Sequence, residues 1–286
     1  MKRLFLLFAV MAAAMSFAQN QKFTYKLTMQ KNSKDGSEKK ALEEMVALVV
    51  SKEGSLFYNE DKVKADSTIS SSIQKAKGTG NFNLDFSGVK MATFSPIVNK
   101  TYPSYATTVM DRVGGNLFEY DETRKPEWKI LPEKQKIGEW ECQKALLSYL
   151  GREWTAWFTS DIPVQDGPYI FHGLPGLIVK ISDSENLYNF ELEGVKNKYG
   201  IADIKKNRLM KINYDKFRKA YQENYLDPGK SMRAMTGSMS GTVTSFKMIE
   251  NGKEVDMKEM ERKQNEQAKT RKLSDLNPID KDLIKE

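Results

Sequence analysis

The chain has 286 residues, with 45 Lys or Arg against 38 Asp or Glu and a formal net charge of +7 at pH 7. This modest positive excess is spread along the chain, so it does not indicate a nucleic-acid-binding protein. The single cysteine excludes an intrachain disulfide, so stability must come from a packed core. No stretch after residue 17 is long and apolar enough to indicate an integral membrane protein.

The N-terminus has the three parts of a cleavable signal peptide. Two basic residues precede the apolar run 4–17, and Ser16-Phe17-Ala18 places small residues at the positions that a signal peptidase reads. The run is too short to anchor the chain comfortably in a membrane. We therefore predict that residues 1–18 are removed, that the mature chain begins at Gln19, and that it is periplasmic or secreted. No cysteine follows the run, which argues against a lipoprotein.

The first part of the mature chain shows the alternation of half-buried strands. Apolar residues within 23–29 alternate with polar ones, which is typical of an antiparallel strand with one face on the core. Residues 45–50 and 56–58 predict two further strands. Residues 61–77 are polar with thin apolar spacing, and they predict either a weak helix or a surface loop.

The middle of the chain predicts a series of short strands. The β-prone runs cover residues 97–110, 116–120, 128–131, 142–150, 152–159, 177–181 and 188–192. Strands at such short spacing typically pair as an antiparallel meander. We therefore predict a mainly β (α+β) fold, an antiparallel curved sheet or partial barrel with one or two packed helices.

One helix is predicted late in the chain. Asn213 is suited to its N-cap, Tyr214, Phe217 and Tyr221 share one face, and Asp227-Pro228-Gly229 ends it. The residues after 246 are densely charged but balanced, which predicts an exposed helix or a frayed tail. The predicted organisation is a signal peptide (1–18), a β-rich domain (19–246) and a charged helical or frayed C-terminal segment (247–286).

Few residues are suited to catalysis. The chain has one cysteine, Cys142, and one histidine, His172, and a histidine beside a thiol can favour the thiolate. A hydrolase or thiol enzyme that uses this pair is therefore an alternative function, although no nucleophile elbow, phosphate-binding loop or two-histidine zinc motif accompanies it. The favoured expectation is a protein that is not an enzyme and has no catalytic residues, cofactor or metal site.

Four methionines give a second alternative. Met232, Met235, Met239 and Met248 carry soft thioether ligands that can hold copper(I) in an exported protein. Methionines more commonly fill a core or an apolar edge, so we favour the structural interpretation.

A cluster of aromatic residues suggests a carrier of apolar ligands. A curved sheet backed by helices can hold an apolar cleft, and the residues that could line it are Trp140, Trp154, Trp157, Phe158, Tyr169 and Phe171. The same residues are also what an ordinary β core would use, so this feature discriminates weakly between the two.

The segment 173–178 predicts a rigid turn. Pro175 followed by Gly176 favours a type II turn over Leu174–Leu177, because proline presets φ at about −65° and glycine accepts the positive φ required next. Gly173 permits a further tight bend. The aliphatic residues that follow lead into a buried strand, so the expected role of this element is structural.

This region resembles a known family. Gly173-Leu174-Pro175-Gly176-Leu177-Ile178 spells the motif that names the GLPGLI family of exported Gram-negative bacterial proteins. Further blocks follow the family's order: Cys142-Gln143-Lys144-Ala145, Gly151-Arg152, Thr155-Ala156-Trp157-Phe158-Thr159, Asp161-Ile162-Pro163 and Gly167-Pro168-Tyr169. The resemblance is specific over residues 128–183, loose over the N-terminal strands and almost absent after residue 247. It implies an exported, β-rich protein, and it supplies no activity and no catalytic residues.

The sequence therefore predicts an exported, non-enzymatic binding or envelope-associated protein. Its partner would be an envelope protein or an apolar ligand. The expected contact residues are Trp154, Trp157, Tyr169 and Phe171, because they flank the turn.

Overall fold

The structure is a computed structural model that describes residues 20–30, 41–79, 81–85, 89–200, 204, 209–229, 245–250, 253–254 and 257–285. The strands of its main sheet are β1 (Gln21–Gln30), β2 (Ala41–Val50), β3 (Gly54–Asn59), β5 (Ile97–Thr101), β6 (Ala106–Val113), β7 (Asn116–Glu122), β8 (Lys129–Ile137), β9 (Trp140–Tyr149), β10 (Arg152–Thr159), β11 (Leu177–Asp183), β12 (Tyr188–Asn197) and β13 (Leu209–Lys211).

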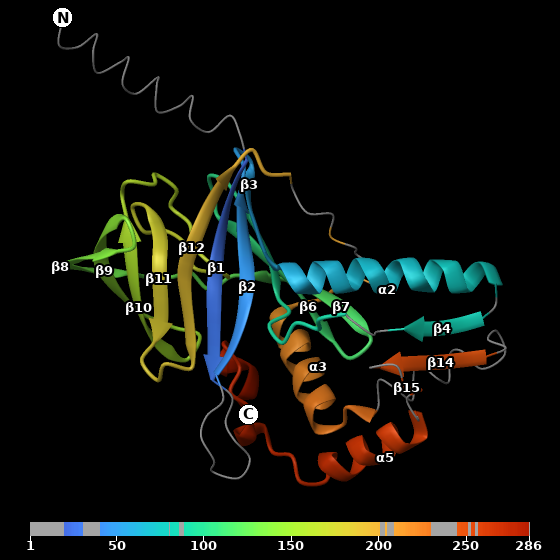
Figure 1. Ribbon diagram of the computed structural model, residues 1–286. Helices are drawn as coiled ribbons and strands as arrows, with labels where there is room; N and C mark the ends of the chain where they lie inside the picture. Colours follow the sequence, from blue (N-terminus) through green and yellow to red (C-terminus); the bar gives the residue numbers. More distant parts are fainter. Residues whose placement is uncertain are drawn as a thin grey trace, which may run out of the picture.

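These twelve strands form one curved sheet in the order β13-β7-β6-β5-β3-β2-β1-β12-β11-β10-β9-β8 (Figure 1). All neighbouring pairs are antiparallel except β13 and β7, which run parallel. The predicted mainly β fold with an antiparallel curved sheet is confirmed. The single β-prone run predicted at 97–110 is in fact two paired strands, β5 and β6.

The alternation in β1 shows how sequence positions the core. Phe23, Tyr25 and Leu27 are fully buried on one face, whereas Thr24 and Lys26 on the other face are only partly buried. A strand places successive side chains on opposite faces, so this period of two forces one face of the sheet inward. We call that side the inner face.

The outer face carries a second, smaller core that a helix covers. Ala47, Val49, Tyr58 and their neighbours form this core. Helix α2 (Glu60–Thr79) packs on it through Val63. The helix starts where the Asn59 side chain accepts hydrogen bonds from the next amides. Of the two alternatives predicted for residues 61–77, the helix is therefore correct.

Helix α3 (Tyr214–Leu226) matches the predicted late helix. The Asn213 side chain accepts a hydrogen bond from the Lys216 amide at 3.0 Å, as expected for an N-cap. Phe217 is buried, and its ring lies 4.7 Å from that of Tyr120 in β7. The helix thus closes the inner face at one end of the sheet (Figure 1).

The described residues after 245 form regular structure, and some of them pack in the core. A small sheet contains β4 (Asn81–Asp85), β14 (Ser245–Glu250) and β15 (Lys253–Glu254), so β14 spans the domain boundary predicted at residues 246 and 247. Helix α5 (Met257–Ala268) follows, with two short 3-10 turns, η1 (Leu273–Asp275) and η2 (Lys281–Ile284). Ile279 and Leu283 are buried in the main core, so the end of the chain belongs to the β-rich fold.

Two sequence features concern the membrane. The predicted signal peptide, residues 1–18, lies outside the described residues. Among the helices that the structure describes, none combines the length and apolar character needed to cross a bilayer.

Candidate functional site

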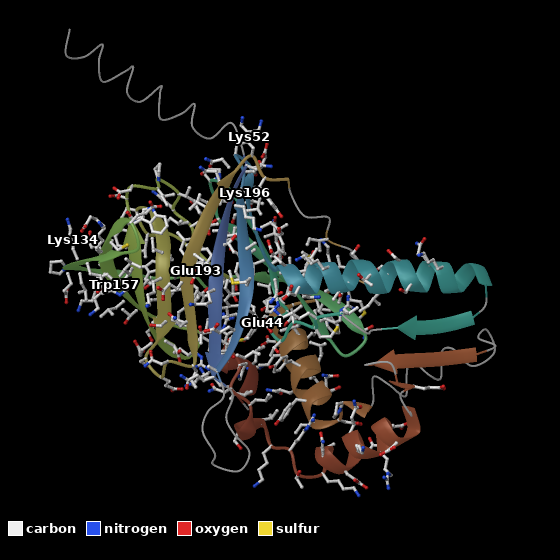
Figure 2. All side chains as sticks on the ribbon, in the orientation of Figure 1. Glu44, Lys52, Lys134, Trp157, Glu193 and Lys196 are labelled. Carbon is white, nitrogen blue, oxygen red and sulfur yellow. The ribbon has the colours of Figure 1, made fainter. Side chains whose placement is uncertain are left out.

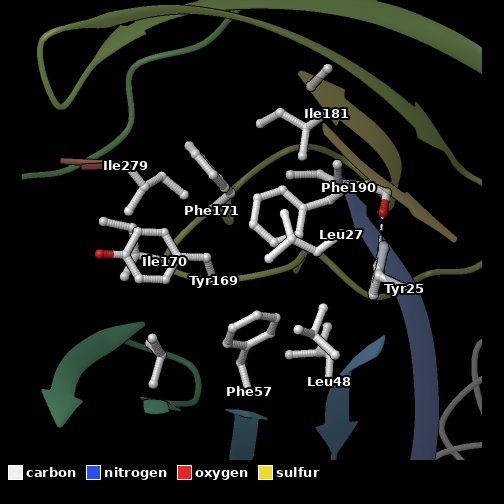
Figure 3. Packing of buried hydrophobic residues seen from close by; sticks show 14 of the residues in the cluster. Tyr25, Leu27, Leu48, Phe57, Tyr169, Ile170, Phe171, Ile181, Phe190 and Ile279 are labelled. Atoms are coloured by element: carbon white, nitrogen blue, oxygen red, sulfur yellow. Dashed lines mark hydrogen bonds between the residues drawn. The ribbon is translucent and has the colours of Figure 1, made fainter. Parts of the chain in front are cut away.

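The segment between β10 and β11, residues 160–176, folds against the inner face of the sheet. We call it the crossover segment. Figure 3 shows its residues Tyr169 and Phe171 among core side chains such as Phe57 and Phe190. The Phe171 ring lies 4.7 Å from that of Trp154 in an edge-to-face arrangement, which suits the ring quadrupoles. The crossover segment therefore fills the core as well as connecting two strands.

A single lysine from β5 holds this segment in place. The Lys100 ammonium donates to the carbonyl oxygens of Gly167 at 2.9 Å, Tyr169 at 2.9 Å and Phe171 at 3.2 Å. It also forms an ion pair with Asp166 at 2.5 Å, and both side chains are 0% exposed. Burial lowers the pKa of Lys100, and the Asp166 carboxylate opposes that effect.

Asp166 is equally well satisfied. One carboxylate oxygen faces Lys100 and accepts the Gly167 amide at 2.7 Å. The other accepts the Ser55 hydroxyl at 2.6 Å and the Tyr102 hydroxyl at 2.5 Å. A buried charge is tolerated only when it is paired and hydrogen-bonded, and this carboxylate meets both conditions. Its chemistry is thus that of an internal clamp.

An aromatic stack lies beside the clamp. The Tyr102 and Tyr105 ring centroids are 4.8 Å apart, and Tyr105 stacks on His172, also at 4.8 Å. The His172 carbonyl accepts a hydrogen bond from the Trp128 indole at 2.8 Å. Burial, reinforced by Lys100, lowers the pKa of His172 to about 4, so its imidazole is neutral near pH 7.

The sequence contained one unused signal for this clamp. Lys100 is two residues from Val98, and alternation in a strand places both on the same face. Val98 belongs to the inner core. A lysine at a core position predicts a buried partner. Nothing local identifies that partner as Asp166, because only the packing of the crossover segment on the inner face brings the two together.

Three of the four predicted contact residues are core residues. Trp154, Tyr169 and Phe171 are 1%, 3% and 0% exposed, so they cannot meet a ligand at the surface. Tyr169 and Phe171 are in the core because the crossover segment turns inward, and it packs them against Trp154 of β10. Trp157 alone is partly exposed, on the outer face of β10.

The predicted turn differs in type. The Leu177 amide donates to Ile162 at 3.1 Å, so it does not close a type II turn onto Leu174. The Gly176 amide instead donates to Leu174 at 2.8 Å, which makes a three-residue turn centred on Pro175. The φ of Gly176 is 147°, and a Cβ there would lie 2.0 Å from the Thr159 carbonyl oxygen. Close packing against β10 therefore requires this glycine.

Gly173 is the other glycine of the predicted turn. Its φ is 94°, so the expected tight bend is present. A Cβ at this position would meet nothing within 4 Å, and backbone conformation is the only requirement for glycine here.

The proposed cysteine–histidine pair finds no support in the described contacts. Cys142 is buried in β9, and its thiol lies 3.6 Å from the Trp140 carbonyl oxygen. His172 contacts Tyr105 instead. Burial raises the pKa of the Cys142 thiol to about 11, which disfavours the thiolate that a nucleophile requires.

This burial predicts an unreactive thiol. At pH 8 a pKa of about 11 leaves roughly one Cys142 thiol in a thousand as thiolate. We expect iodoacetamide to modify the folded chain at least about a hundredfold more slowly than the chain in urea. Mass spectrometry of samples quenched over time measures both rates, and equal rates would contradict the burial and restore the thiol-enzyme alternative.

The four methionines considered as an alternative copper site lie mostly outside the described residues. Met232, Met235 and Met239 are in that part of the chain, whereas Met248 lies in β14. Among the described residues, no group of three or more His, Cys, Asp or Glu side chains is placed to hold a metal ion.

The comparisons with known proteins bear on the centre of the chain and on the fold. A family described as a protein of unknown function (Porph_ging) matches residues 148–180, which include β10, the crossover segment and the start of β11. No curated protein matches the chain. Solved structures of PNGF-II in two crystal forms are similar, with TM-scores of 0.52 and 0.49 and 16% and 17% identity.

Each PNGF-II match covers 73% of this chain and 34% of that one. The chain thus spans about a third of the protein that it resembles. At this identity the first likeness shows the fold alone, and the family match is limited to the region around the crossover segment.

Proposed function

We propose that the chain is an exported GLPGLI-type protein of the cell envelope that binds a partner protein and is not an enzyme. One observation carries the proposal: Trp157 is the one predicted contact residue on the outer face, beyond the surface that α2 covers. Figure 1 places α2 near β6 and β7, away from β9 and β10. Figure 2 labels Trp157 toward the other end of the strand order, near β9 and β10.

The surroundings of Trp157 suit a protein interface. Lys144 on β9 and Lys180 on β11 are in register with it on either side. The Lys144 ammonium lies 6.0 Å from the Trp157 ring centroid, and Lys180 pairs with Glu191 at 2.8 Å. A tryptophan within a rim of mixed charges is typical of the residues that dominate binding energy.

The burial of the other aromatic residues disfavours the apolar-ligand alternative. Tyr169, Phe171 and Trp154 pack edge to face with their neighbours, and Leu174 beside the turn is also buried. A carrier needs apolar side chains that face a cleft. Here the same side chains pack against one another in the core.

The non-enzymatic part of the proposal is supported by the state of the reactive groups. The Cys142 thiol and the His172 imidazole have pKa values of about 11 and about 4, so neither titrates near neutral pH. Asp166 and Lys100 are buried against each other. Catalysis needs a poised group within reach of a substrate.

Replacing Trp157 tests the binding surface. The wild-type chain and its variants would be exported in the source bacterium, cross-linked in the envelope and recovered, and the captured partner would be quantified by mass spectrometry. We expect Trp157→Ala to weaken partner binding about 30-fold, the effect of losing an interface residue worth about 2 kcal/mol. Thr155→Ala is the matched control, since Thr155 shares the outer face of β10.

Two further variants separate binding from catalysis. Cys142→Ser and His172→Ala should leave partner capture unchanged. Equal capture by Trp157→Ala and wild type would reject the proposed surface. Export itself is tested by the mass of the recovered chain, which should correspond to a start at Gln19.

A further inference from the structure

Residues 277–285 occupy a groove built by distant parts of the fold. We call them the C-terminal segment. None of them belongs to a strand, and η2 is their only regular structure. Figure 1 shows the end of the chain beside α3. The groove is made by residues at or beside the ends of β7, β9, β10 and β11 together with α3, through the contacts described next.

A buried arginine donates hydrogen bonds to the backbone of the C-terminal segment. Arg152 at the start of β10 donates to the carbonyl oxygens of Pro278 at 2.7 Å and Ile279 at 3.1 Å, and to the Asn277 side chain. Its guanidinium also pairs with Asp183 at 2.8 Å, with both side chains 1% exposed. Guanidinium groups suit such fixed, multiple recognition because their donors are planar and rigid.

A second arginine forms ion pairs with the acidic side chains of the C-terminal segment. Arg124, just beyond β7, pairs with Asp280 at 2.7 Å and with Asp282 at 2.8 Å. The Tyr214 hydroxyl of α3 donates to Asp280 at 2.7 Å, and the Arg124 guanidinium lies 4.4 Å from the Tyr214 ring centroid. Asp280 is almost fully buried, so this contact is selective for a carboxylate.

Apolar and main-chain contacts complete the fit. Ile279 and Leu283 are buried in the core, and Figure 3 shows Ile279 near Ile170 and Phe171 of the crossover segment. The Lys281 amide donates to the Leu150 carbonyl oxygen at 2.9 Å.

The connection between β9 and β10 also lies close to the C-terminal segment. Gly151, between β9 and β10, has a φ of 69°, and a Cβ there would lie 2.9 Å from that of Lys281. The connection between β9 and β10 thus accommodates the C-terminal segment closely.

We propose that this groove is a peptide-binding site, occupied here by the chain's own end. The peptide chemistry that it recognises is an aliphatic residue followed directly by aspartate, with a second aliphatic residue three positions after the aspartate. Because the segment pairs with no strand, it can leave without breaking any sheet hydrogen bond. A peptide of the same chemistry from another protein can then take its place.

The site is independent of the Trp157 surface. Its receptor residues, such as Arg124 and Arg152, lie at or beside the ends of strands. Trp157 instead lies within β10, on the outer face. Trp157→Ala should leave peptide binding unchanged, so failure of either proposal can be recognised separately.

The test uses the full chain with a weakened C-terminal segment. Ile279→Ala combined with Leu283→Ala removes both apolar anchors and leaves every receptor residue intact. We expect this double variant to bind a fluorescent peptide of residues 274–286, measured by anisotropy, at least about tenfold more tightly than the wild-type chain does, because the wild-type groove is filled in cis. Replacing the peptide's aspartate equivalent to Asp280 with asparagine should weaken binding about tenfold or more.

A coupling measurement identifies the receptor. When Arg124→Gln is added to the double variant, the difference between the aspartate and asparagine peptides should disappear. A folded double variant, with the circular dichroism of wild type, that fails to bind the peptide would overturn the proposal.

Hydrogen exchange decides the case if the double variant does not fold. In the wild-type chain, the Lys281 amide should exchange through local opening, at least about tenfold faster than the Ala156 amide in β10. Equal exchange at both positions would mean that the segment leaves only on global unfolding, and it would reject the proposal.

Discussion

Replacing Asp166 with asparagine is expected to lower the free energy of unfolding by about 3–5 kcal/mol, the usual cost of removing one partner from a buried ion pair. The substitution preserves the side-chain volume, so the loss reports the charge. It leaves the Lys100 ammonium buried without its counter-ion, and it weakens the acceptor that Ser55 and Tyr102 use. Urea unfolding followed by tryptophan fluorescence measures the change.

Glu191→Gln is the matched control for this prediction. It removes the carboxylate of a partly exposed pair, Lys180–Glu191, whose atoms are 2.8 Å apart. Exposed pairs contribute about 0–1 kcal/mol because solvent screens them. Similar losses in the two variants would show that the Lys100–Asp166 clamp does not hold the crossover segment.

The second large effect is expected from Gly176→Ala. The added Cβ would lie 2.0 Å from the Thr159 carbonyl oxygen and 3.0 Å from the Ser160 amide nitrogen, both of which are backbone atoms that cannot rotate away. We expect a loss of more than about 4 kcal/mol, or no folded protein. The yield of folded chain and its thermal midpoint measure the effect.

Gly173→Ala separates crowding from backbone strain. Its φ is also positive, at 94°, but its Cβ would meet nothing within 4 Å. The cost should therefore be that of the conformation alone, about 1–3 kcal/mol. If both variants were equally stable, the close approach of the crossover segment to β10 would be contradicted.

Local patterns predicted much of the fold. The alternation of 23–29 predicts β1, and the N-cap Asn213 followed by a helix with an apolar face predicts α3. Both patterns depend only on residues close together in the sequence. For residues 61–77 the sequence permits either a weak helix or a surface loop, since the buried positions of α2 are few and its cap, Asn59, lies before the polar run.

The candidate site was less predictable. Cys142 and His172 are reactive residue types that a sequence displays directly, whereas lysine and aspartate are usually exposed and nothing local links Lys100 to Asp166. Their pairing depends on β5 lying across from the crossover segment, 66 positions further along the chain by number. Neither composition nor periodicity encodes which strands become neighbours over such a separation.

The aromatic residues show the same limit from another side. From the sequence, Trp154, Trp157, Tyr169 and Phe171 are the aromatic residues that flank the turn. For Tyr169 and Phe171 the sequence does not distinguish inside from outside, because the crossover segment has no strand period to assign its faces. Tertiary packing buried three of these side chains and left Trp157 partly exposed.

By itself, the sequence determined the mainly β class, most strand positions, the late helix and the glycine-rich turn region, because these follow from short-range periodicity and backbone preference. Only the tertiary structure decided the strand order, the buried clamp and the docking of the C-terminal segment. Each of these joins residues far apart in the chain, such as Arg152 and Ile279, and a charged side chain becomes a core residue only when folding supplies its partner.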